Sequence, residues 1–159
     1  MKEIEIISIS GQHIEFIQQI KSLFDKMYDE FIGMGVILHP VENASDIWYR
    51  SIENSLNRFG LLVAILKNGS VIGFAHGALL MAPAYLDAGK TGVITHVYVE
   101  KNFRKEGLAN SMVSELENWF IKKEVHSIEL QVISTNITGK LFWKNLDYKE
   151  ELIQYRKLI

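Results

Sequence analysis

Hydrophobic and polar positions alternate at the start of the chain and then change to a helical period. Residues 3–10 alternate, with Ile4 and Ile6 on the same side, which predicts a first strand. Apolar side chains then recur at near-helical spacing over 13–31 and again from about 44 or 45 to 58, which predicts two amphipathic helices. The chain is therefore expected to begin with one strand followed by two helices.

The middle of the chain has the pattern of a β-hairpin. Residues 61–66 and 71–80 are apolar, β-rich runs, and Asn68-Gly69 between them is the pair favoured in a type I′ turn. A polar connection over 82–92, which contains Gly and Pro, leads to a further strand over 93–99. Three consecutive strands are therefore predicted here.

The last part of the chain alternates between helices and strands. We expect a helix from 107 to about 123, a buried strand over 127–133, a short helix over 136–145 and a final strand over 148–158. The complete order is β-α-α-β-β-β-α-β-α-β, which indicates the α/β class with a mixed, α+β-type sheet. A length of 159 residues suits one domain that spans residues 1–159.

Composition and charge exclude several classes of protein. The formal charge of −2 provides no basic field for nucleic acid or an anionic membrane. The absence of cysteine excludes disulfides, thiolate metal sites and a Cys nucleophile, and the five histidines show no pair at metal-ligand spacing. The N-terminus is acidic where a signal peptide would be apolar, and no apolar run approaches the ~18 residues of a membrane span. We expect a cytoplasmic protein that has no metal and binds neither nucleic acid nor membrane.

The most informative segment is the junction between the strand over 93–99 and the helix that begins near 107. A short basic loop with Arg104, Lys105 and Gly107 joins the two elements. This arrangement directs unpaired backbone N–H groups and the positive end of a helix dipole at one point, where an anion such as phosphate is stabilised. The chain contains neither a Walker P-loop nor a dinucleotide-binding fingerprint. The alternative is an ordinary connection between a strand and a helix.

The pattern Arg104-x-x-Gly107-x-Ala109 after this strand resembles the pyrophosphate-binding segment of the GNAT superfamily, the acyl-CoA-dependent N-acetyltransferases. That segment reads Gln/Arg-x-x-Gly-x-Gly/Ala in the family. The order of elements also resembles GNAT proteins over essentially the whole chain. The resemblance implies a splayed central sheet, in which the main chain of Val97 and Val99 would hold the pantetheine arm of CoA.

The resemblance also assigns the pyrophosphate to the loop and the start of the next helix. Main-chain N–H groups would come from Lys105, Glu106, Gly107, Leu108, Ala109 and Asn110, and Arg104 would add a cation at the mouth. Further along, Asn136 matches a family Asn that contacts the cofactor arm, and Gly139 replaces a small Ala. Trp143 stands where the family often has a Tyr that protonates the departing thiolate, and an indole cannot do so.

As a GNAT protein, the chain would transfer an acetyl group from acetyl-CoA to a primary amine of a small molecule or peptide by direct attack, without a metal. The alternative from another class is a non-catalytic acyl-CoA-binding module, in which Trp143 marks the loss of turnover. A nucleotide-binding or structural domain is a third interpretation. A homodimer is compatible with all three.

His96 and Tyr98 are the candidates for catalysis, since a regular strand places both on one face. His96 is the preferred base because an ordinary imidazole ionises near neutral pH, and the alternative is a structural hydrogen bond. His76 is expected to be structural. In the family the acceptor is recognised by the first two helices and their loop, which here contain Met34, His39, Trp48 and Tyr49. Aromatic residues in that zone also suit the core.

Overall fold

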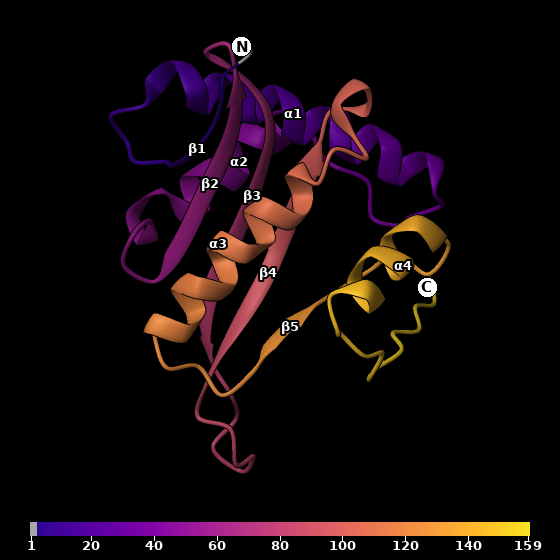
Figure 1. The fold of residues 1–159 in the computed structure, drawn as a ribbon. Helices are drawn as coiled ribbons and strands as arrows, with labels where there is room; N and C mark the ends of the chain where they lie inside the picture. The colour runs from indigo at the N-terminus through magenta and orange to yellow at the C-terminus, as the bar shows by residue number, and fades with distance from the viewer. Residues whose placement is uncertain (1–2) are drawn as a thin grey trace.

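The computed structural model describes residues 3–159 and shows a five-stranded sheet with helices on both faces (Figure 1). The strands, which are adjacent in chain order, are β1 (Ile4–Ser8), β2 (Gly60–Lys67), β3 (Ser70–Met81), β4 (Lys90–Val99) and β5 (Ile128–Leu130). The helices are α1 (Ile14–Gly33), α2 (Ala44–Ile52), α3 (Leu108–Lys122) and α4 (Ile137–Asn145), with short 3-10 turns at Glu53–Ser55 and Lys101–Phe103. The pairs β1–β2, β2–β3 and β3–β4 are antiparallel, and β5 runs parallel to β4.

Two apolar layers cover the two faces of the sheet. α1 and α2 pack on one face, where Leu62 of β2 joins Phe24 and Met27 in the core. α3 packs on the opposite face, where Val63 joins a second cluster that includes Phe120. β2 is buried on both faces, which explains its uninterrupted apolar sequence.

Phe120 packs closely against the sheet because two strands carry glycine beneath it. A Cβ at Gly77 of β3 would lie 2.7 Å from its ring, and a Cβ at Gly92 of β4 would also lie 2.7 Å from it. A side chain at either position would therefore push α3 away from the sheet.

β4 and β5 separate soon after they meet, which confirms the expected splay of the central sheet. The two strands pair only over Gly92–Ile94 and Ile128–Leu130, and β4 continues to Val99 without a paired strand on that side. Figure 1 shows β5 diverging from β4 on its way to α4. The main chain of β4 from residue 95 to 99 is thereby left available on one edge.

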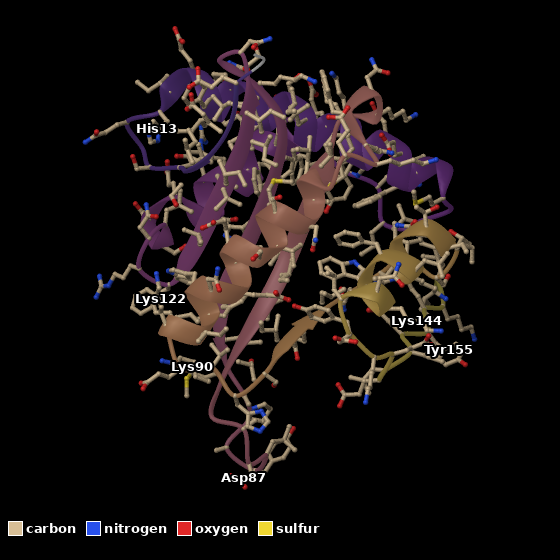
Figure 2. All side chains as sticks on the ribbon, viewed as in Figure 1. His13, Asp87, Lys90, Lys122, Lys144 and Tyr155 are labelled. Atoms are coloured by element: carbon tan, nitrogen blue, oxygen red, sulfur yellow. The ribbon has the colours of Figure 1, made fainter. Side chains whose placement is uncertain are left out.

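The predicted hairpin and all four predicted helices are confirmed. Asn68 and Gly69 have φ of 52° and 78°, the left-handed values that a type I′ turn requires. Figure 2 shows Asp87 at the tip of the β3–β4 connection, which projects beyond the body of the fold.

The final strand predicted over 148–158 is wrong, since no residue after Asn145 lies in a helix or strand. Leu152, Ile153 and Tyr155 are 86%, 68% and 89% exposed, and Figure 2 shows Tyr155 at the margin of the molecule. Alternating side chains form a strand only where a neighbouring strand accepts the backbone hydrogen bonds. β5, the strand at that edge of the sheet, has three residues rather than the predicted seven of 127–133, and it pairs with β4 alone.

Candidate active site

The loop after β4 turns back so that α3 runs along one face of the sheet (Figure 1). Lys105 and Gly107 both have left-handed backbones, with φ of 66° and 77°. Gly107 is the N-cap of α3, and no side chain caps the helix there. A Cβ at Gly107 would meet nothing within 4 Å, so glycine is favoured by its φ and not by lack of space. The first N–H groups of α3 thus open onto a roomy, exposed loop.

The six residues expected to supply main-chain N–H groups differ in the exposure of their side chains. Leu108 is buried in the core beneath α3, and Ala109 is half-buried. The side chains of Lys105, Glu106 and Asn110 are exposed. Leu108 therefore anchors the start of the helix while its main chain remains at the loop.

Arg104 braces the loop against the rest of the fold. Its Nε donates to the carbonyl oxygen of Val99 at 2.8 Å, and a terminal guanidinium nitrogen donates to both carboxylate oxygens of Glu30 at 2.9 Å. The guanidinium also lies over the ring of Tyr98, 5.2 Å from its centroid. The charge of Arg104 is therefore matched by Glu30. In residues 3–159, Lys105 forms no ion pair.

A bulge in β4 brings two histidines together through Thr95. His96 pairs with His76 and Ile94 pairs with Gly77, so Thr95 is the extra residue. Its Oγ1 lies 2.6 Å from His76 Nδ1, 2.9 Å from His96 Nδ1 and 3.2 Å from the His76 carbonyl oxygen.

The three contacts of Thr95 assign the histidine tautomers, because a hydroxyl has one proton. The carbonyl oxygen can only accept, so all three contacts are hydrogen bonds only when Thr95 donates to it. Both imidazoles must then donate their Nδ1–H to Thr95. The Nε2 of His96 is left with a free lone pair, as is the buried Nε2 of His76, which has no partner in the described part of the chain.

Both imidazoles are neutral at pH 7. Burial lowers the pKa of His76 to about 4. Burial, with a smaller contribution from neighbouring His76, also lowers the pKa of His96 to about 4. The ionisation of His96 expected near neutrality is therefore moved into the acid range, and its Nε2 can accept a proton at any pH above about 5.

Tyr98 lies on the same α1–α2 side of the sheet as His96, but its hydroxyl is already engaged. It donates to Glu30 Oε1 at 2.9 Å. Burial, and then the bond to Glu30, raises the pKa of Tyr98 to about 12. Tyr98 is therefore poorly suited to exchange protons near neutral pH, which leaves His96 as the better candidate.

An apolar cavity of about 350 Å³ opens beside His96. Its walls come from α1, the α1–α2 loop, α2 and β4. The lining residues are Phe24, Tyr28, Leu38, His39, Pro40, Val41, Ala44, Ile47, Trp48 and His96. Of the four residues expected near the acceptor, His39 and Trp48 line it. Tyr49 is buried in the core, and Met34 ends α1, where its carbonyl accepts a hydrogen bond from Thr135 at 2.6 Å.

The residues from 20 to 148 match the model of the acetyltransferase (GNAT) family. The chain belongs to this GNAT family. It is an acyltransferase with the mixed sheet described above.

Solved structures share this GNAT fold at low sequence identity. Aminoglycoside N-acetyltransferase AAC(6')-Iy, in complex with CoA, is 16% identical with a TM-score of 0.79, covering 99% of this chain and 96% of that one. A predicted acetyltransferase from Clostridium acetobutylicum, with acetyl-CoA, is 17% identical with a TM-score of 0.72 over 99% and 96% of the two chains. Ribosomal-protein-alanine N-acetyltransferase from Brucella melitensis biovar Abortus 2308 is 14% identical, with a TM-score of 0.71 over 99% and 100%.

In this GNAT chain the residues of α4 have clear structural tasks. Asn136 caps the helix, since its side-chain oxygen accepts from the Gly139 N–H at 2.9 Å. A Cβ at Gly139 would lie 2.5 Å from the same amide, which explains glycine there. Trp143 is half-buried and meets Phe142 and Tyr148 edge-on. Its position in the fold is thus maintained by packing.

In residues 3–159, no cluster of three or more His, Cys, Asp or Glu side chains could hold a metal ion. No helix in the same range is both long and apolar enough to cross a membrane.

The GNAT protein is expected to lose stability as the pH falls from about 6.5 to about 4. An unfolded histidine has a pKa near ~6.5, whereas His76 and His96 titrate near 4 in the fold. The unfolded chain binds more protons in this window, so the free energy of unfolding decreases as pH decreases. Urea denaturation at pH 7 and pH 5 measures the effect, and His96→Gln should reduce it. Equal stabilities of the wild type at both pH values would contradict the neutral assignment.

Proposed function

We propose that this GNAT protein transfers an acetyl group from acetyl-CoA to a primary amine of a small molecule or peptide. The observation that carries the proposal is the layout of β4. A short loop leads from the end of the strand to the N-terminus of α3, which has no side-chain cap and suits phosphate. Within the strand, His96 lines the apolar cavity. Between the two, the edge of β4 toward β5 is unpaired. Solved proteins of this fold contain CoA or acetyl-CoA.

Two stretches of main chain would bind two parts of CoA, the pyrophosphate and the pantetheine arm. The N–H groups of residues 105–110 would hold the pyrophosphate, with Lys105 beside them and Arg104 keeping the loop in place. Val97 would bind the pantetheine arm through its free edge. The Val99 carbonyl already accepts from Arg104, so it contributes less. The side-chain oxygen of Asn136 already accepts from the Gly139 N–H, so Asn136 would contact the pantetheine arm through its side-chain NH2 group.

His96 would act on the amine rather than on the thiol. The amine nitrogen forms a bond to the acetyl carbon, the carbon–sulfur bond breaks, and the nitrogen loses a proton. A pKa of about 4 makes His96 too weak to deprotonate a free alkylammonium, whose pKa is near ~10. After the new bond forms, the nitrogen protons are far more acidic, and the His96 Nε2 lone pair can accept one. A thiol of pKa near ~8.5 leaves as thiolate without an acid, so Trp143 need not supply a proton.

Turnover with acetyl-CoA tests this function directly. The protein is mixed with acetyl-CoA and single amines from a panel of polyamines, aminoglycosides, arylalkylamines, amino acids and short peptides. Free thiol is measured continuously, and mass spectrometry identifies the product. We expect thiol release that depends on an amine and yields the N-acetyl amine. Binding of CoA with no acetylated product from any amine would favour the non-catalytic module instead.

A further inference from the structure

We infer that the acceptor is a primary amine carried on a compact apolar body that contains a ring, such as an arylalkylamine. The inference rests on the proposed acetyl transfer and names the class of substrate that enters the cavity beside His96. A polyamine or an aminoglycoside would be a poor acceptor.

The walls of the cavity are aromatic and aliphatic. Phe24 and Trp48, whose rings stack with centroids 4.7 Å apart, both line the cavity and make part of its surface aromatic. Leu38, Val41 and Ile47 remain 58%, 66% and 55% exposed around it. Covering exposed apolar surface is favourable, so an apolar ligand gains binding energy there. An aromatic ring on the ligand can pack against these aromatic side chains edge-on or offset.

The charges around the cavity do not suit a polycation. No carboxylate lines it, and Glu42 of the adjoining loop is not among its lining residues. Asp46, next to Ile47 on α2, lies 2.8 Å from Lys21. Each additional ammonium group buried here would lack a counter-charge, and burying an unpaired charge is costly. A ligand with one amino group avoids that cost.

Size and reactivity favour the same class. A volume of about 350 Å³ is near the small end of the range for ligand sites, roughly 300–1,000 Å³, which suits one ring system with a short chain. Apolar surroundings also disfavour the ammonium form and so lower the pKa of a bound amine. A short linker would let the ring contact Trp48 while the neutral nitrogen lies near His96.

The test is a comparison of two amines on two matched variants. 2-Phenylethylamine represents the apolar class, and 1,5-diaminopentane carries a second cation in place of the ring. Ile47→Asp puts a carboxylate at the cavity, whereas Ile121→Asp makes the same change at a similarly exposed position on α3. For the wild type we expect kcat/KM to be at least about tenfold higher for 2-phenylethylamine. Ile47→Asp should reduce this ratio by about tenfold or more, and Ile121→Asp should leave it unchanged.

The outcomes separate the acceptor class from the transferase function. Equal or better turnover of 1,5-diaminopentane, neamine or a short peptide by the wild type would overturn the apolar class while acetyl transfer stands. An unchanged ratio in Ile47→Asp would do the same. If no amine is acetylated, calorimetry of 2-phenylethylamine with the CoA-loaded protein decides. Binding that is lost in Ile47→Asp and kept in Ile121→Asp would support the apolar-amine site without the transferase, and absence of binding would overturn both.

Discussion

Replacing His96 by glutamine is expected to lower kcat/KM by about 10²–10⁴-fold, the usual contribution of a general base. Glutamine can keep a hydrogen bond to Thr95, but it offers no basic nitrogen where His96 Nε2 lies. The amine must lose its own proton before it attacks, so kcat/KM should rise with pH toward the amine pKa near ~10 in both the wild type and the variant. The ionisation of His96 should add a further decrease only near pH 4, because burial and His76 lower the pKa of His96 to about 4. Steady-state kinetics from pH 4 to pH 9 measures the loss of rate and the added decrease near pH 4.

His39→Gln is the matched control for this variant. His39 lines the same cavity from the α1–α2 loop, so its substitution changes the cavity in a comparable way without removing His96. We expect a much smaller change in kcat/KM. A His96→Gln enzyme with near-normal rates and an unaltered pH profile would show that His96 is a scaffold residue, and that the amine loses its proton to water.

Replacing Gly107 by aspartate is expected to weaken CoA binding about 10- to 100-fold relative to replacement by asparagine. Asparagine and aspartate have almost the same shape, and both tolerate the left-handed backbone found at Gly107, where φ is 77°. The two variants therefore differ in one negative charge beside the expected pyrophosphate. Repulsion over a few ångströms near a protein surface is worth about 1–4 kcal/mol, and about 1.4 kcal/mol corresponds to tenfold in Kd.

Calorimetric titration with CoA gives the two dissociation constants, and thermal unfolding verifies that both variants are folded. The difference should shrink at high salt, because counter-ions screen an exposed charge. If the folded Asp and Asn variants bind CoA equally well at low salt, the pyrophosphate does not lie at the start of α3.

Local patterns were sufficient to predict the helices and the hairpin, since each of these depends on nearby residues. The apolar stripe of α1 and the Asn68-Gly69 turn are examples. The last strand could not be predicted correctly, because residues 148–158 alternate like a strand but find no partner. A strand over 148–158 needs another strand to accept its backbone hydrogen bonds. The length of β5, which ends at Leu130, is not encoded in residues 148–158.

The part of the candidate site that depends on the main chain could be predicted. The part that depends on contacts between residues far apart in the sequence could not. Gly107 between a strand and a helix predicts an anion site from sequence alone, and the structure places Gly107 at the uncapped start of α3. The bond from Arg104 to Glu30 joins positions 74 residues apart, and no sequence signal marks Glu30. The bulge at Thr95 brings His76 and His96 together through one hydroxyl, and bulges leave little trace in a strand pattern.

Chemical-shift mapping of CoA on ¹⁵N-labelled protein tests the central claim most directly, because it reports on each backbone N–H group. The largest changes are expected at residues 105–110, followed by Val97 on the free edge of β4, with little change at the exposed tail after residue 149. Changes that leave 105–110 unaffected and gather instead around Ser8, Asn57 and Trp119, which line a second cavity, would contradict the proposed CoA site.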